Sequence, residues 1–179
     1  MLHYTIHKNK ESNPWMTLVH GAGGSSTIWF KQIRRFSRDY NILLVDLRGH
    51  GASAKGESRK DSQNYTFKSV SQDVIDVLDH ENIPSSHFAG ISLGTIIIRQ
   101  IAEDHPERVL SMVMGGAIMK LTTKSRILIR LGVIFKSMLP YLFLYRFFAF
   151  IIMPKKTHRE ARNLFVREAR KLCRKEFLR

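Results

Sequence analysis

The chain has 179 residues, a single cysteine and a formal net charge of +14. This length suits one domain with a buried core, and one cysteine excludes an internal disulfide framework and a cysteine-based zinc site. Residues 1–120 carry 14 Lys and Arg against 12 Asp and Glu, whereas residues 121–179 carry 15 against 3. The sequence therefore predicts a core over residues 1–120 and a separate basic region over residues 121–179.

The first fifteen residues lack the basic segment and following apolar run that are typical of a signal peptide. One cysteine is also compatible with a reducing compartment. We therefore expect a cytoplasmic protein.

Short apolar segments alternate with helical patterns through the first 120 residues. An outer strand is predicted at residues 2–8, and buried strands at 15–20, 41–47, 87–92 and 109–118. Helices are predicted at 27–39, 66–82 and 95–108, the last stopped by Pro106, with a polar loop at 56–64. In the second helix, the predicted buried face consists of Phe67, Val70, Val74, Val77 and Leu78.

This alternation predicts an α/β fold, with a mostly parallel open sheet flanked by helices. Three of the buried strands end in the loops HGAGG, DLRGHG and GISLG. Because parallel strands present their carboxyl ends at one edge, we expect these three loops to lie on the same rim, where ligands bind.

The segment Gly90-Ile91-Ser92-Leu93-Gly94 stands between a predicted strand and a predicted helix. A serine hydroxyl is a useful nucleophile only when it is exposed and a base removes its proton. A sharp strand-to-helix turn exposes it, and the flanking Gly90 and Gly94 permit the bend. The N–H of Leu93 would then stabilise an oxyanion. The alternative for Ser92 is a turn or helix-capping serine.

A second glycine-rich loop, His20-Gly21-Ala22-Gly23-Gly24, follows the strand at residues 15–20. The N–H of Ala22 is the candidate for a second oxyanion donor, with His20 and Gly21 supporting the loop. The alternatives are an anion-binding loop or a flexible one. The loop lacks the Lys-Ser/Thr pair of a phosphate-binding P-loop.

HGAGGSSTIW, DLRGHGAS and GISLGT, in this order, resemble the α/β-hydrolase superfamily over roughly residues 2–120. The resemblance implies that Ser92 is the nucleophile, that Ala22 and Leu93 provide the oxyanion hole, and that a helical cap follows the core. It also implies a structural role for the loop after the third strand, which contains Asp46, Arg48, Gly49, His50 and Gly51.

The family orders its catalytic triad as serine, then an acid, then a histidine. The histidines after Ser92 are His105, expected to be solvated or to cap a helix C-terminus, and His158, which follows no strand. His20 and His50 precede Ser92, against the family order. The acid and the base are therefore unknown, and we expect a truncated, inactive or nearly inactive chain whose strand at 109–118 forms an exposed apolar edge.

Three interpretations of residues 121–179 remain open. The resemblance favours a cap that shapes a hydrophobic acyl pocket. Alternatively, this region could lie on an anionic membrane surface, because an apolar run at 137–153 is followed by a basic amphipathic helix at 155–179. The apolar positions of this helix include Leu164, Phe165, Ala169, Leu172, Cys173 and Phe177. Nucleic-acid binding has only the charge in its favour, since no recognised nucleic-acid module is present.

The function predicted is that of a serine hydrolase acting on an ester, thioester or related small-molecule acyl substrate. The alternative is a non-catalytic remnant of the fold that binds a partner or an anionic membrane through its basic helices. No cofactor and no metal are expected, because neither metal-ligand spacing nor a dinucleotide fingerprint occurs.

Overall fold

The computed structural model describes residues 1–55, 65–117 and 140–170, together with Thr123, Arg126, Ile127, Arg130 and Ile134. The chain divides into two compact units, Met1–Ala117 and Ile118–Arg179. The loop predicted at 56–64, and Leu172, Cys173 and Phe177 of the predicted basic helix, lie outside the described residues.

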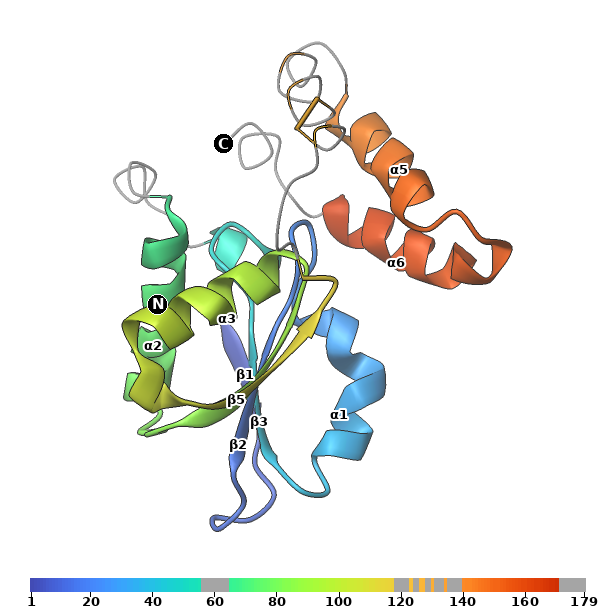
Figure 1. Ribbon diagram of the computed structural model, residues 1–179. Helices are drawn as coiled ribbons and strands as arrows, with labels where there is room; N and C mark the ends of the chain where they lie inside the picture. The colour runs from blue at the N-terminus through green and yellow to red at the C-terminus, as the bar shows by residue number, and fades with distance from the viewer. Residues whose placement is uncertain are drawn as a thin grey trace. The chain divides into compact units, whose positions relative to one another are not determined.

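The first unit is built on a five-stranded sheet (Figure 1). The strands are β1 (Tyr4–His7), β2 (Trp15–Val19), β3 (Asn41–Val45), β4 (Ser86–Ile91) and β5 (Val109–Gly115). Their order is β1-β3-β2-β4-β5, and only β1 runs antiparallel to its neighbour. The predicted mostly parallel open sheet is therefore confirmed, with β1 as an outer strand.

Helices cover both faces of this sheet (Figure 1). A short 3-10 turn, η1 (Ser26–Trp29), leads into α1 (Phe30–Phe36) on one face. The other face carries α2 (Phe67–His80) and α3 (Leu93–Asp104). The 3-10 turns η2 (Gly51–Lys55) and η4 (Pro106–Arg108) follow β3 and α3, and Pro106 stands where α3 was predicted to stop.

Alternating side chains of the central strands form two cores, because successive residues of a strand point to opposite faces. Val19, Leu43, Val45 and Phe88 pack in the cluster that contains the buried residues of α2 and α3. Met16, Leu18, Ile42, Leu44 and Ala89 pack with Trp29 and with half-buried residues of η1 and α1. These strands are buried on both faces, as their continuous apolar runs predicted.

Two predictions of burial are wrong. The strand predicted as buried at 109–118 forms β5, in which every residue after Val109 is exposed, Val113 to 64%. The cause is its position, because among the described strands β5 pairs only with β4 and ends the sheet. The exposed apolar edge expected for this strand is therefore confirmed. Phe67 was predicted on the buried face of α2 but is 51% exposed, because it is the first residue of the helix and extends beyond the core.

In the second unit, α5 (Tyr141–Ile152) is followed by η5 (Lys156–His158) and α6 (Arg159–Ala169). The rings of Tyr145 and Phe165 lie 5.5 Å apart and join the two helices. The basic amphipathic helix predicted at 155–179 is represented by η5 and α6 within the described residues. In the part of the chain that is described, no helix combines the length and apolar character needed to cross a bilayer.

Candidate active site

Ser92 occupies the junction between the last residue of β4, Ile91, and the first residue of α3, Leu93. Its backbone angles are φ 52° and ψ −115°, a conformation that L residues other than glycine rarely adopt. Its N–H donates to the carbonyl of Gly115 at the end of β5, at 2.9 Å. Its carbonyl accepts from the N–H and hydroxyl of Thr95 at 2.9 and 2.6 Å. The main chain around Ser92 is therefore held in a strained turn on both sides.

The two glycines that flank this turn are required by close packing. A Cβ on Gly90 would lie 2.7 Å from the carbonyl carbon and oxygen of Gly94. A Cβ on Gly94 would lie 2.4 Å from the carbonyl oxygen of Val19 at the end of β2. These distances are shorter than any real Cβ contact, so only glycine lets α3 begin this close to β2 and β4.

The loop after β2 lies against the serine turn. A Cβ on Gly21 would be 3.2 Å from Ser92 Cβ and 3.0 Å from the carbonyl oxygen of Ile91. The next residue, Ala22, is exposed, and Leu93 supplies the first N–H of α3. Within the described ranges, neither of these two N–H groups donates a hydrogen bond to another residue. The two predicted oxyanion donors thus belong to adjoining segments beside Ser92.

His20 is fully buried and joins the loop after β2 to the loop after β3. Its Nε2 accepts from the N–H of Leu47 at 2.9 Å, and its Nδ1 lies 2.8 Å from the carbonyl oxygen of Gly21. These partners place the ring proton on Nδ1, which donates to Gly21. Both ring nitrogens are used to hold loops, as a supporting role for His20 requires.

Asp46 makes a second connection between the same loops. Its carboxylate oxygens accept from the N–H groups of Ser26, at 2.7 Å, and Ala52, at 2.9 Å. Burial would raise the pKa of Asp46, but these hydrogen bonds outweigh it and the pKa is lowered from 3.8. Gly51, with φ +51°, is needed here because a Cβ would lie 2.3 Å from Asp46 Oδ2. Asp46 is therefore an ionised support of the loops that surround Ser92.

The loop after β3 is also tied to α2. Arg48 donates from Nε and Nη2 to the two carboxylate oxygens of Asp73 at 2.8 and 2.6 Å. His50 Nδ1 lies 2.8 Å from the carbonyl oxygen of Arg48, and its ring stands 5.2 Å from that of His20. The three loops predicted to share one rim are thus linked by hydrogen bonds and direct packing.

The structure does not bring a base to Ser92 from the residues predicted as possibilities. Within the described ranges, no side chain lies within hydrogen-bond distance of the Ser92 hydroxyl. His105 follows the last residue of α3, a helix of twelve residues, so about 18 Å of helix separates it from Ser92. Its N–H donates to Ile101, as expected for a residue that ends a helix.

His158 belongs to the second unit, where its Nδ1 is buried without a hydrogen-bond partner among the described residues. Among the residues with described positions, no group of three or more His, Cys, Asp or Glu side chains is arranged to hold a metal ion.

Two groups that hold the loops around Ser92 were not predicted from the sequence, namely the carbonyl of Gly115 and the N–H of Ser26. Both are main-chain groups, which leave no pattern in the residue types.

The sequence matches the family described as alpha/beta hydrolase fold over residues 14–147. It is 31% identical over 108 residues to 3-oxoadipate enol-lactonase 2 of Acinetobacter baylyi, covering 60% of this chain and 39% of that protein. It is 29% identical over 101 residues to the fluoroacetate dehalogenase of a Burkholderia species, covering 56% of this chain and 33% of the relative. The matched segment is well under half the length of these curated relatives.

Among solved structures, a carboxylesterase of Nitrososphaera gargenis superposes with a TM-score of 0.79 at 19% identity, covering 99% of this chain and 65% of the other. The enol-lactonase of Burkholderia xenovorans superposes with a TM-score of 0.73 at 19% identity, covering 99% and 67%. At these identities the likeness concerns the fold. Because the family match spans residues 14–147, most of the sequence, the chain belongs to the alpha/beta hydrolase fold family.

Proposed function

We propose that this chain carries the nucleophile side of a serine hydrolase that acts on an ester, thioester or related small acyl compound. The observation that carries the proposal is the strained conformation of Ser92, at φ 52°, between two glycines at which a Cβ would meet main-chain atoms at 2.4–2.7 Å. Strain of this kind is kept where it serves a function, and here it lifts a hydroxyl to the rim of the sheet. The hydrolase and lactonase relatives support the same class of reaction.

In the proposed reaction, the Ser92 hydroxyl oxygen attacks the carbonyl carbon of the substrate and a base takes its proton. Negative charge develops on the carbonyl oxygen, where the N–H groups of Ala22 and Leu93 stabilise it. The N-terminus of α3 adds its positive helix dipole at the same place. The alcohol or thiol then leaves, and water releases the acyl group from the serine.

The base and the acid of such a triad are not assigned to a residue of this chain. His20 and Asp46 are engaged in holding loops, and His105 is at the far end of α3. We therefore propose that the 179-residue chain alone turns over little or no substrate. The oxyanion hole without a base leaves only a small residual acceleration over water.

The nucleophile proposal is tested by reaction with a fluorophosphonate, followed by mapping of the modified serine by mass spectrometry. An adduct on Ser92 that is absent from Ser92→Ala is expected, and added imidazole should accelerate it by acting as an external base. Ser111 is the matched internal control, because its hydroxyl lies 2.8 Å from His87 Nδ1 but it stands within strand β5 and not at the start of a helix. Equal modification of Ser92 and Ser111 contradicts the proposal.

The low activity of the chain is tested separately with an activated ester such as p-nitrophenyl acetate. Hydrolysis at the rate of the Ser92→Ala variant is expected. A rate clearly above that variant would mean that a base in this chain reaches Ser92.

The alternative is a non-catalytic protein of this fold that binds an anionic partner through its basic helices. The concentration of arginine on α6 favours an anionic ligand. Fluorophosphonate that modifies serines indiscriminately, together with anion binding, would favour this alternative over the hydrolase.

A further inference from the structure

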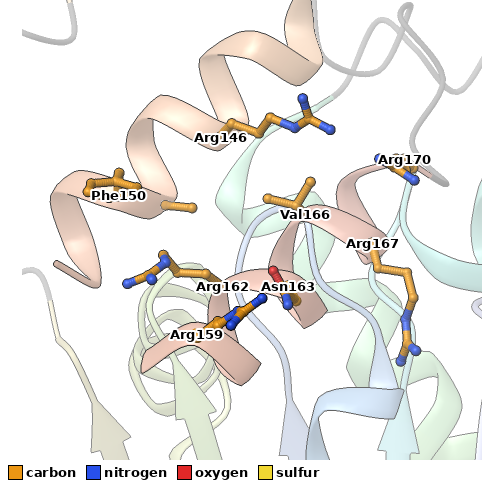
Figure 2. Close-up of a pocket in the computed structure, with 9 residues that line it drawn as sticks. Arg146, Phe150, Arg159, Arg162, Asn163, Val166, Arg167 and Arg170 are labelled. Atoms are coloured by element: carbon orange, nitrogen blue, oxygen red, sulfur yellow. The ribbon is translucent and has the colours of Figure 1, made fainter. Parts of the chain in front are cut away.

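A pocket lined by arginine lies between α5 and α6 of the second unit, with a volume of about 630 Å³ (Figure 2). Arg146 comes from α5, Arg159, Arg162 and Arg167 from α6, and Arg170 from the position just after α6. Apolar side chains, including Phe150 and Val166, complete the wall. The volume is in the range of small-molecule sites.

The sequence of α6 explains how the arginines reach one pocket. The lining positions of this segment are 159, 162 and 163, 166 and 167, and 170, a recurrence every three to four residues that places them along one face of a helix. Glu160, on the same helix, is not among the described lining residues. The lining arginines of α6 therefore share the face that meets α5.

Arg162 fixes one wall of the pocket. Its Nη1 donates to the carbonyl oxygens of Met153 and, at 2.8 Å, of Lys155, in the connection between the two helices. Its guanidinium carbon lies 4.9 Å from the centre of the Phe150 ring, a cation–π arrangement. These contacts hold α6 to the end of α5 and orient the guanidinium before any ligand arrives.

Three of the other lining arginines have no acidic partner among the described residues. Arg146, Arg159 and Arg170 form no ion pair with another described residue, and the described lining contains no acidic side chain. Guanidinium groups gathered in one pocket repel each other, and because Arg146, Arg159 and Arg170 are exposed, water screens part of this repulsion. An anion placed among them would relieve this repulsion.

We propose that this pocket binds a phosphate-type anion, and specifically a diphosphate group carried by a small molecule or by a lipid head group. Guanidinium forks match phosphate oxygens in pairs, so one phosphate would occupy two or three arginines. Five arginines and a volume of this size exceed what one phosphate needs. The inference does not depend on Ser92 or on its proposed chemistry.

The test is calorimetric titration of the 179-residue chain with inorganic pyrophosphate at low salt. Binding with one site per chain is expected, and Arg146→Gln/Arg159→Gln should weaken it at least tenfold. The matched control is Arg34→Gln/Arg38→Gln, which removes the same charge from exposed positions of the first unit and should leave binding within twofold of the wild type. Absence of binding, or equal weakening by both double variants, would overturn the proposal.

A second variant guards against misfolding of the first. Arg146→Lys/Arg159→Lys keeps the charge and the helix-forming character but removes the planar forks. Pyrophosphate binding weakened severalfold, with unchanged helical circular dichroism, would support recognition by the guanidinium groups. Binding as tight as in the wild type would show that charge alone attracts the anion and that no fitted pocket exists.

Vesicles distinguish the two sources of the anion. The chain is sedimented with phosphatidylcholine vesicles with and without diacylglycerol pyrophosphate, in the presence and absence of inorganic pyrophosphate. Sedimentation that requires diacylglycerol pyrophosphate and is competed by inorganic pyrophosphate assigns the pocket to a lipid head group. Pyrophosphate binding without vesicle binding assigns it to a soluble ligand. Vesicle binding that ignores pyrophosphate and persists in Arg146→Gln/Arg159→Gln contradicts a role for the pocket.

Discussion

The Cα of Gly94 faces the carbonyl oxygen of Val19 so closely that a Cβ would stand 2.4 Å from that oxygen. This contact brings the first turn of α3 against the end of β2. It is the point at which the serine turn and the loop after β2 are fixed relative to each other.

Gly94→Ala should therefore destabilise the fold. Both the carbonyl of Val19 and the helix must move to admit the methyl group, at a cost of about 1–3 kcal/mol in the free energy of unfolding. Urea denaturation measures the change. Gly115→Ala is the control, since its Cβ would meet only ordinary contacts of 3.5 Å or more. Similar losses in both variants would show that the Val19 contact is not the cause.

Replacing Ser92 with glycine should stabilise the protein relative to Ser92→Ala. Alanine keeps the strain at φ 52°, whereas glycine releases about 1–3 kcal/mol of it. Part of this gain, about 0.5–1 kcal/mol, is offset by the greater entropy of glycine in the unfolded chain. Comparison of the two unfolding midpoints tests the strain directly. A less stable Ser92→Gly variant would mean that the turn is relaxed.

Asp46→Asn should reveal a pH-dependent contribution to stability. The folded pKa of Asp46 is lowered from 3.8, because the hydrogen bonds from Ser26 and Ala52 to the carboxylate outweigh the opposing effect of burial. A lowered folded pKa gives stabilisation that is complete above the unfolded pKa and is lost as the pH falls through the folded value.

Near pH 7 the asparagine variant should be about 1–3 kcal/mol less stable, because its amide group faces a main-chain donor. The difference should stay constant down to about pH 5 and narrow below about pH 4. Denaturation midpoints across this range provide the measurement, with Asp39→Asn at an exposed site as the control. If the stability difference between the wild type and Asp46→Asn does not narrow at low pH, the ionised carboxylate of Asp46 does not stabilise these loops.

Arg48→Lys should cost about 1–2 kcal/mol in the free energy of unfolding, because lysine cannot make both hydrogen bonds to Asp73. The two side chains are only 16% and 20% exposed. Arg35→Lys is the matched control, since its pair with Asp39 is 66% and 59% exposed and should change stability by less than about 0.5 kcal/mol. Equal effects on thermal unfolding would argue against a special role for the Arg48 pair.

The sequence predicted those parts of the fold that depend on local pattern. Continuous apolar runs identified β2, β3 and β4, and the position of Pro106 identified the end of α3. The exposed edge expected for β5 came from the family resemblance and not from its apolar run, because such a run records what a strand can bury and not whether a neighbour covers it. Phe67 is a similar case, because its helical spacing predicts burial although it is the first residue of α2 and extends beyond the core.

For the candidate site, the residue types predicted the turn at Ser92 and the role of His20 in holding the loop after β2. They could not predict which main-chain groups hold them, such as the carbonyl of Gly115. The sequence carries a signal for the arginine pocket, because the spacing of Arg159, Arg162 and Arg170 places them on one helix face. Its meeting with Arg146 depends on how α5 and α6 pack, which spacing within one helix does not reveal.

The position of β5 has a consequence for the dynamics of the sheet. β3 has a hydrogen-bonded neighbour on each side, whereas β5 is paired on one side only among the described strands. Alternate amides of β5 therefore point away from β4, and they should exchange with deuterium far faster than those of β3. Ser92 is attached through the Gly115 carbonyl to this less protected border. Local unfolding that separates β5 from β4 would therefore disturb the turn at Ser92 before it disturbs the central strands of the sheet.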